Sequence, residues 1–100
     1  MVQMRLLTPE DFQPWVGKQV RVNTEPKPIE LTLERIERKA RLPNPIDFRE
    51  PFSLFFSAPF DVYLLDTHYE FDFGRGGPYT IVISQLQPTD GRRHYQAVFA

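Results

Sequence analysis

The stretch HYEFDFGRGGPYTIVI, residues 68–83, predicts a β-hairpin and with it the fold class. Tyr69, Phe71 and Phe73 alternate with polar residues, which is the period-two pattern of a strand buried on one face. Glycines then interrupt the chain, and a run with apolar side chains on both faces follows at residues 79–86. We expect that run to be a central strand covered on both sides, and the last third of the chain to form a three-stranded antiparallel meander.

The glycines between these strands raise the question of a phosphate-binding loop. Such a loop points backbone N–H groups at the anion from the start of a helix, and the Walker pattern has Lys and then Ser or Thr after its last glycine. Here Pro78 and Tyr79 follow Gly77, and the pattern continues as a strand. The sequence therefore predicts a turn that uses glycine for positive φ angles, not a phosphate site.

The rest of the chain adds one short helix and further strands. Thr8 is a suitable cap for a helix that begins at Pro9, and Gly17 is suited to end it. Residues 29–41 fit both strand and helical spacing, and we prefer a strand with a bulge near Arg35 and Ile36. Residues 42–51 contain three prolines and form a loop. We predict a mainly β, antiparallel small barrel or sandwich of about six strands, folded as a single domain over residues 1–100.

Composition argues against several classes of function. The formal net charge of −1 gives no overall positive field, so we expect no nucleic-acid partner. The absence of cysteine excludes disulfides, zinc fingers and thiol nucleophiles. No apolar run approaches the length of a membrane span, and the first residues do not resemble a signal peptide. We therefore expect a cytoplasmic protein with no membrane contact and no cofactor.

The sharpest chemical pattern is formed by His68, Glu70 and Asp72. Alternate residues project from one face of a strand, so these three side chains are candidates for a metal site, with His94 as a further ligand. Glu70 and Asp72 are also candidates for the acid pair of a glycoside hydrolase. A metal site needs ligands that converge in a concave place, whereas a strand face opposite Tyr69 is typically a solvated surface. We prefer the solvated face, and we predict neither a metal site nor catalytic residues.

An excess of apolar side chains follows at residues 52–65. Phe55 points away from the apolar face of its strand, and Phe60 and Tyr63 crowd the next segment. Either other segments cover these side chains, or they dock a protein partner or a second copy of the chain. We predict a non-catalytic protein-binding or assembly module that uses Phe55, Phe60 and Tyr63. A metal-dependent or hydrolytic enzyme and a barrel around a small apolar ligand are the alternatives.

Three motifs extend this hypothesis: Leu-Thr-x-x-Asp-Phe at residues 7–12, Pro-Phe-Ser-Leu-x-Phe at 51–56 and Tyr-x-Ala-Val-Phe at 95–99. With them the chain resembles, over nearly its whole length, a small bacterial family that is catalogued only as a domain of unknown function. The motifs are packing signatures and bring no active site with them. The resemblance implies a role accessory to phage-tail-like collar proteins, and so assembly more than catalysis.

Overall fold

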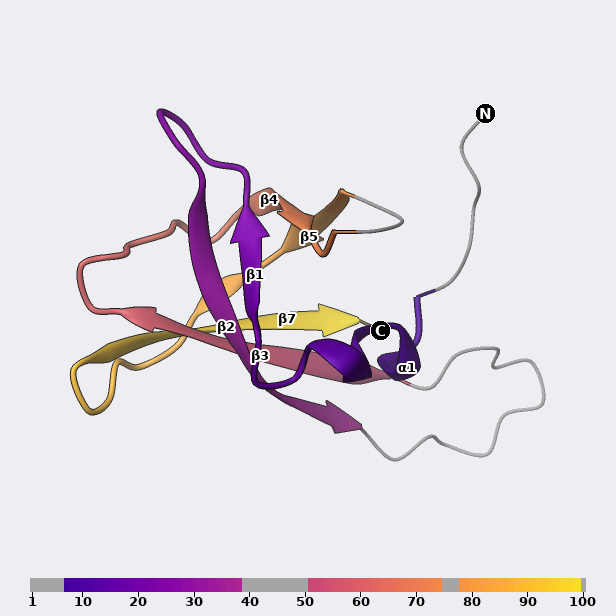
Figure 1. Ribbon diagram of the computed structural model, residues 1–100. Coiled ribbons are helices and arrows are strands. Elements are labelled where there is room, and N and C mark those ends of the chain that lie inside the picture. The colour runs from indigo at the N-terminus through magenta and orange to yellow at the C-terminus, as the bar shows by residue number, and fades with distance from the viewer. Residues whose placement is uncertain (1–6, 39–50, 75–77, 100) are drawn as a thin grey trace.

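The computed structural model describes residues 7–38, 51–74 and 78–99 (Figure 1). Most of the predicted loop at 42–51 and the centre of the glycine turn, 75–77, lie outside these ranges. The elements are α1 (Pro9–Phe12), a 3₁₀ turn η1 (Gln13–Trp15), β1 (Gln19–Val22), β2 (Ile29–Arg38), β3 (Phe52–Pro59), β4 (His68–Asp72), β5 (Tyr79–Val82), β6 (Ser84–Gln85) and β7 (Arg92–Phe99).

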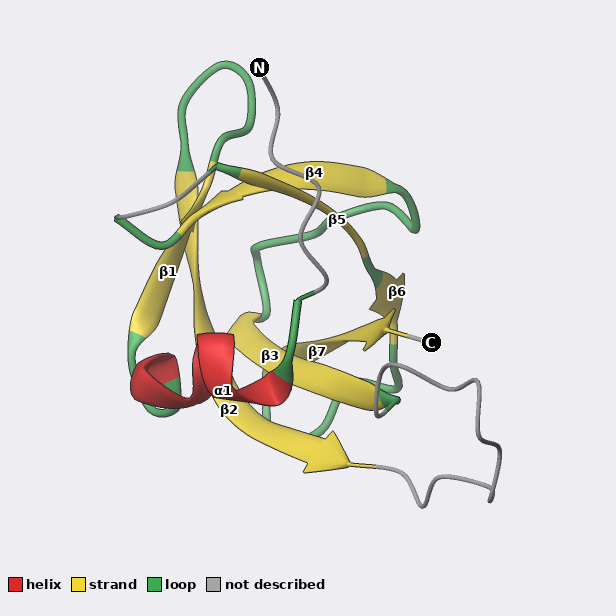
Figure 2. Ribbon diagram, turned by 90° about the vertical axis from the view of Figure 1, so that its right-hand side faces the viewer, coloured by secondary structure: helices red, strands yellow, loops and turns green. Residues whose placement is uncertain are grey.

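The seven strands form one antiparallel sheet in the order β5-β4-β1-β2-β3-β7-β6. The sheet curls into a half-barrel, and α1 lies in front of it in Figure 2. This confirms the predicted mainly β, antiparallel architecture with one short N-terminal helix. The two ends of the strand order, β5 and β6, are consecutive pieces of one segment, because only Ile83 separates them. The same stretch of chain thus pairs with β4 through its first half and with β7 through its second half.

The prediction of one central strand over residues 79–86 is wrong. The stretch splits at Ile83, whose N–H donates to the carbonyl oxygen of Thr67 at 3.0 Å in the register of the β4–β5 pairing, whereas the chain pairs with β7 from Ser84 on. The side chain of Val82 is 64% exposed, so β5 is covered on one side only. Because this stretch crosses from one side of the curled sheet to the other, it forms two edge strands, and the predicted three-stranded meander is replaced by two separate strand pairs.

The ambiguous stretch at residues 29–41 is a strand, β2, through Arg38, and residues 39–41 lie outside the description. Its pairing with β3 shifts between Leu33 and Arg35, just before the predicted bulge. The shift inserts one extra residue, which changes the side chains that face inward. Leu33 is fully buried before the shift, and Ile36 packs against the core after it.

The N-terminal helix follows the predicted signals. The backbone N–H of Thr8 donates to Asp11 Oδ2 at 2.8 Å, which is half of a capping box. The helix α1 passes directly into η1, and Gly17 follows with a φ angle of +85°, in the left-handed region that favours glycine. The Glu10 carboxylate binds Arg38 of β2 at 2.6 Å, and this hydrogen bond lowers the pKa of Glu10.

Aromatic rings close the end of the sheet where β3 begins and β7 ends. Phe12 of α1 is 1% exposed. Its ring centroid lies 6.0 Å from that of Phe52, 5.2 Å from that of Phe73 and 5.6 Å from that of Phe99. Burying a Phe side chain stabilises the folded state by about 1.5–3 kcal/mol, so this one residue does much to hold α1 against the strands.

Side chains from both halves of the curled sheet fill its interior. Phe56 of β3 and Phe71 of β4, for example, have ring centroids 5.1 Å apart. The buried apolar residues are Phe12, Val20, Val22, Leu31, Leu33, Phe52, Leu54, Phe56, Ala58, Leu64, Phe71, Phe73, Ile81, Ile83, Tyr95 and Ala97. These inward side chains form the hydrophobic core of the domain.

Candidate functional site

The predicted chemical pattern at His68, Glu70 and Asp72 lies on β4, with its two carboxylates engaged in structural contacts. Asn23 Nδ2 donates to Glu70 Oε1 at 3.3 Å, which links β1 to β4. The backbone N–H of Gly74 donates to Asp72 Oδ1 at 2.7 Å, which supports the glycine turn. Within residues 7–38, 51–74 and 78–99, no three His, Cys, Asp or Glu side chains are placed to hold a metal ion together.

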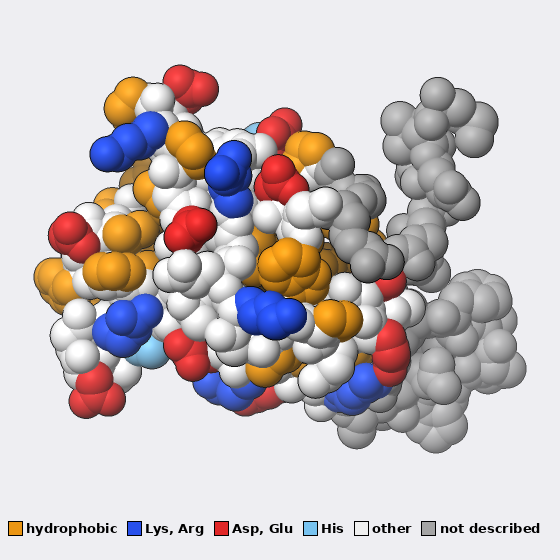
Figure 3. Space-filling model, in the orientation of Figure 1, with side chains coloured by type: hydrophobic (Ala, Val, Ile, Leu, Met, Phe, Trp, Pro, Cys, Tyr) orange, Lys and Arg blue, Asp and Glu red, His pale blue; other side chains and the backbone are white. Residues whose placement is uncertain are grey.

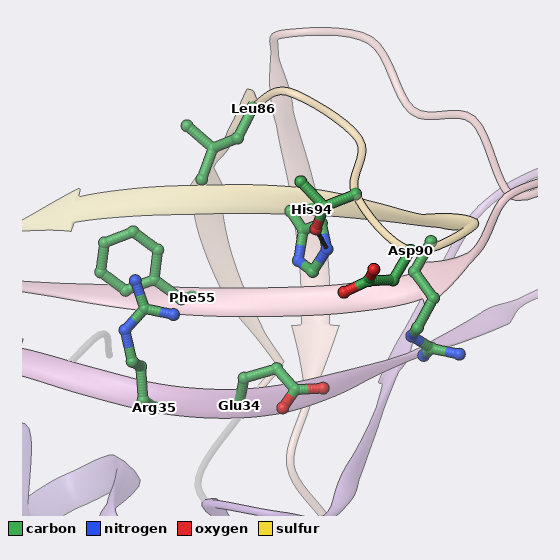
Figure 4. Close-up of a pocket in the computed structure, with 8 residues that line it drawn as sticks. Glu34, Arg35, Phe55, Leu86, Asp90 and His94 are labelled. Atoms are coloured by element: carbon green, nitrogen blue, oxygen red, sulfur yellow. Dashed lines mark hydrogen bonds between the residues drawn. The ribbon is translucent and has the colours of Figure 1, made fainter.

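His94, the proposed additional ligand, belongs instead to a pocket of about 410 Å³ on the outer face of β2, β3 and β7 (Figure 4). Phe55 and His94 rise from β3 and β7, with Arg35 and Glu34 of β2 on one side and Leu86 on the other. The lining residues are Glu34, Arg35, Phe55, Leu86, Thr89, Asp90, Arg92 and His94. The sequence analysis did not find this pocket, because its residues meet only through the strand register.

A polar network joins residues of this pocket to the neighbouring Ser57. Ser57 is 1% exposed and lies directly opposite His94 in the β3–β7 ladder. Its hydroxyl donates to the Glu34 carboxylate and accepts a hydrogen bond from Arg92 Nη2 at 3.2 Å. The His94 ring bonds Thr89 Oγ1 at 2.9 Å. Serine, histidine and carboxylates are therefore close together, but the serine hydroxyl is buried and bonded to other groups, which does not suit a nucleophile.

Phe55, the first predicted interaction residue, is partly covered. The guanidinium carbon of Arg35 lies 4.0 Å from its ring centroid, which is a cation–π contact. Arg35 also pairs with Glu37 at 2.8 Å. Because Phe55 lies in the middle of β3 and Phe60 follows its end, roughly 16 Å of extended chain separates the two. Phe55 belongs to the lining of the outer pocket, whereas Phe60 and Tyr63 lie beyond the end of β3.

The other two predicted residues, Phe60 and Tyr63, lie with Leu65 on the segment of residues 60–67, hereafter the β3–β4 segment. These residues are 51%, 56% and 61% exposed. We call the three residues the aromatic patch, after the rings of Phe60 and Tyr63. Between them, Val62 and Leu64 turn toward the core. Figure 3 shows hydrophobic side chains, with a basic one beside them, at the end of the molecule where this segment runs.

Arg93 of β7 contacts two members of the aromatic patch. Its guanidinium carbon lies 4.2 Å from the ring centroid of Phe60 and 4.8 Å from that of Tyr63. Its Nε–H donates to the carbonyl oxygen of Phe60 at 2.6 Å. The sequence analysis missed this residue as part of the surface, because its position beside Phe60 depends on the pairing of Arg93 with Ala58.

The backbone of the β3–β4 segment has no regular secondary structure, yet neighbouring strands hold it in place. The buried hydroxyl of Tyr95 donates to the carbonyl oxygen of Val62 at 2.9 Å and accepts from the N–H of Leu64 at 2.9 Å. Burial raises the pKa of Tyr95, which favours the protonated hydroxyl that donates to Val62. Three more hydrogen bonds follow: Leu65 N–H to Tyr69 Oη at 3.0 Å, Gln85 N–H to Asp66 Oδ1 at 2.8 Å, and Ile83 N–H to Thr67 O at 3.0 Å.

Comparison with known families identifies the domain. A family model described as a domain of unknown function, DUF6916, matches residues 7–99. The chain belongs to the DUF6916 family. The match extends from α1 to β7, so the curled sheet and the aromatic patch both lie within the DUF6916 domain. The resemblance to an uncharacterised family is thereby confirmed.

Two further findings complete the comparison. No curated protein and no solved structure matches this DUF6916 chain. In the part of the chain that the structure describes, no helix combines the length and the apolar character needed to cross a membrane.

Proposed function

We propose that this DUF6916 domain is a non-catalytic protein-binding module and that the aromatic patch is its binding surface. One observation carries the proposal: three large apolar side chains, each more than half exposed, lie on one short segment, and two of them contact the arginine Arg93. Single exposed apolar residues are common on protein surfaces, whereas a group of them typically marks an interaction site. Tyrosine and arginine are also among the residues that contribute most to binding at protein interfaces.

The hydrogen bonds of the β3–β4 segment support the same proposal. A binding loop that is ordered only on association loses conformational entropy at that moment, which weakens binding. Here Tyr95, Tyr69 and the chain between β5 and β6 fix the backbone in the free protein. The aromatic patch therefore presents its side chains with much of that entropy already lost during folding.

The biological setting is part of the proposal. The resemblance to a bacterial family found beside phage-tail-like collar proteins supports a role in assembling such a particle in the cytoplasm. A non-catalytic role accords with the structural contacts of Glu70 and Asp72 and with the buried hydroxyl of Ser57. A collar protein is the first partner to test.

Site-specific photo-crosslinking tests the proposal. A photoreactive phenylalanine analogue at Tyr63 in the full chain, expressed in bacterial cells, should capture a protein that the same analogue at Val98 does not capture. Val98 is the matched control, because it is 56% exposed but lies outside the aromatic patch. The captured protein, once purified, should bind the wild-type domain and bind Phe60→Ala/Tyr63→Ala at least about tenfold more weakly.

Two results would contradict the proposal. Equal capture from Tyr63 and Val98 would show that the aromatic patch has no preferred partner. An unchanged affinity of the double variant would show that the patch does not bind the captured protein. Since both side chains are largely exposed, we expect the double variant to unfold at the same denaturant concentration as the wild type.

A further inference from the structure

The charge of Arg93 gives the aromatic patch a chemical preference. We propose that the patch recognises an acidic–apolar segment of a partner protein, in which a carboxylate binds Arg93 and the flanking apolar side chains contact Phe60, Tyr63 and Leu65. This inference rests on the proposed function, because it names the partner chemistry of the same surface.

Among the residues that the structure describes, the guanidinium of Arg93 has no carboxylate partner. Within the part of the chain that the structure describes, the ion pairs are those of Arg35 with Glu37 and of Arg38 with Glu10. Arg93 instead has two ring faces and the carbonyl oxygen of Phe60, which uses one of its five N–H donors. The surface is therefore complementary to an anion.

The surroundings of Arg93 strengthen its attraction for a carboxylate. The rings of Phe60 and Tyr63 exclude water from part of the guanidinium, and a charge pair is stronger where the local dielectric constant is lower. The bond from Nε–H to the Phe60 carbonyl fixes the side chain, so little rotamer entropy is lost when an acid binds. A planar guanidinium and a carboxylate can form two parallel hydrogen bonds, which adds geometric selectivity.

The apolar part of the partner follows from what surrounds the charge. Phe60, Tyr63 and Leu65 are exposed on the same segment, so the residues on either side of a bound carboxylate meet apolar surface. Arg92, the neighbour of Arg93 on β7, faces the other side of the strand and donates to Ser57 in the outer pocket. It is a matched control, with the same charge one residue away in a different environment.

A peptide titration followed by nuclear magnetic resonance tests this preference. The probes are the blocked peptide acetyl-GLDFG-amide and the same peptide with asparagine in place of aspartate. We expect the acidic peptide to shift the backbone signals of residues 60–65 and the Arg93 Nε–H signal. The asparagine peptide should bind about tenfold more weakly, and the difference should shrink as the salt concentration rises from about 50 to 500 mM.

Variants locate the effect. Arg93→Gln should remove the difference between the two peptides, whereas Arg92→Gln should leave it unchanged. Phe60→Ala should weaken both peptides, and the acidic one more, because it removes apolar contact and also exposes the Arg93 guanidinium to water. The comparison of the two peptides on the wild-type domain needs no variant, so it remains decisive if Arg93→Gln fails to fold.

The possible failures are distinguishable. Equal binding of the two peptides at the aromatic patch would refute the carboxylate preference and leave the patch as a protein-binding surface. Equal losses in Arg92→Gln and Arg93→Gln would also refute it, because they would indicate a diffuse charge effect. If neither peptide shifts the signals of residues 60–65, the inference is wrong, and the crosslinking experiment judges the proposed function separately.

Discussion

Replacing Tyr95 by phenylalanine should loosen the β3–β4 segment without emptying the core. The substitution keeps the buried ring and removes the hydroxyl that links Val62 and Leu64. Each of these hydrogen bonds contributes about 0.5–1.5 kcal/mol net, so their combined loss should reduce the free energy of unfolding by roughly 2 kcal/mol. For a domain of this size, that corresponds to a fall in Tm of roughly 10 °C.

Urea unfolding of the wild type and Tyr95→Phe measures this loss. Tyr79→Phe is the control, because Tyr79 is only half-buried and its hydroxyl has no hydrogen bond to any residue that the structure describes. We expect this control to change stability by less than about 0.5 kcal/mol. If Tyr95→Phe unfolds at the same urea concentration as the wild type, the hydroxyl does not hold the segment. Preorganisation of the aromatic patch would then have no support.

Four further predictions concern Tyr95, Phe12, Gly91 and His68. Burial raises the pKa of Tyr95 above its ordinary value of 10.0, so the contribution of its hydroxyl to stability should be complete below about pH 10 and lost as the pH rises through the raised pKa. Ultraviolet titration of the wild type should show one tyrosine that ionises after the others, and this late step should be missing in Tyr95→Phe. Phe12→Ala should cost about 3–5 kcal/mol in urea unfolding, and a loss below about 1 kcal/mol would mean that α1 is not packed as described. Gly91 has a φ angle of +70° and open space around it, so Gly91→Ala should lower the free energy of unfolding by about 1 kcal/mol through backbone strain alone. An unchanged Tm would contradict this. Zinc should shift the Tm of the wild type and of His68→Ala equally, whereas a larger shift in the wild type would revive a metal site at His68.

The helix start could be predicted because its signal is local. The capping residue Thr8 acts on its own backbone neighbours. The alternation in β4 likewise reports one buried face of one strand. The splitting of residues 79–86 is different, because it depends on how far the sheet curls before its last strands meet. Apolar side chains on both faces indicate a core strand, and the exposure of Val82 arises only from the closure.

The apolar residues of the candidate site could be predicted from the sequence, whereas the arginine beside them could not. The excess of apolar residues that drew attention to Phe60 and Tyr63 is a local property of the sequence. Arg93 reaches them only because β3 and β7 pair with Ala58 opposite Arg93, a register that no short pattern specifies. The outer pocket was missed entirely, since Glu34 of β2 and His94 of β7 are brought near each other by two strand pairings.

The β3–β4 segment separates the residues needed for folding from those that are exposed. Val62 and Leu64 face the core, and their backbone groups bind the Tyr95 hydroxyl, so these two positions anchor the segment. Tyr63 and Leu65 alternate with them and face outward. A segment that served only as a connection would be equally well anchored with polar residues at the outward positions, because the hydrogen bonds that hold it involve its backbone. In the free domain Tyr63 gains a cation–π contact with Arg93, whereas Leu65 is 61% exposed. The proposed association with a partner would account for the apolar identity of both positions.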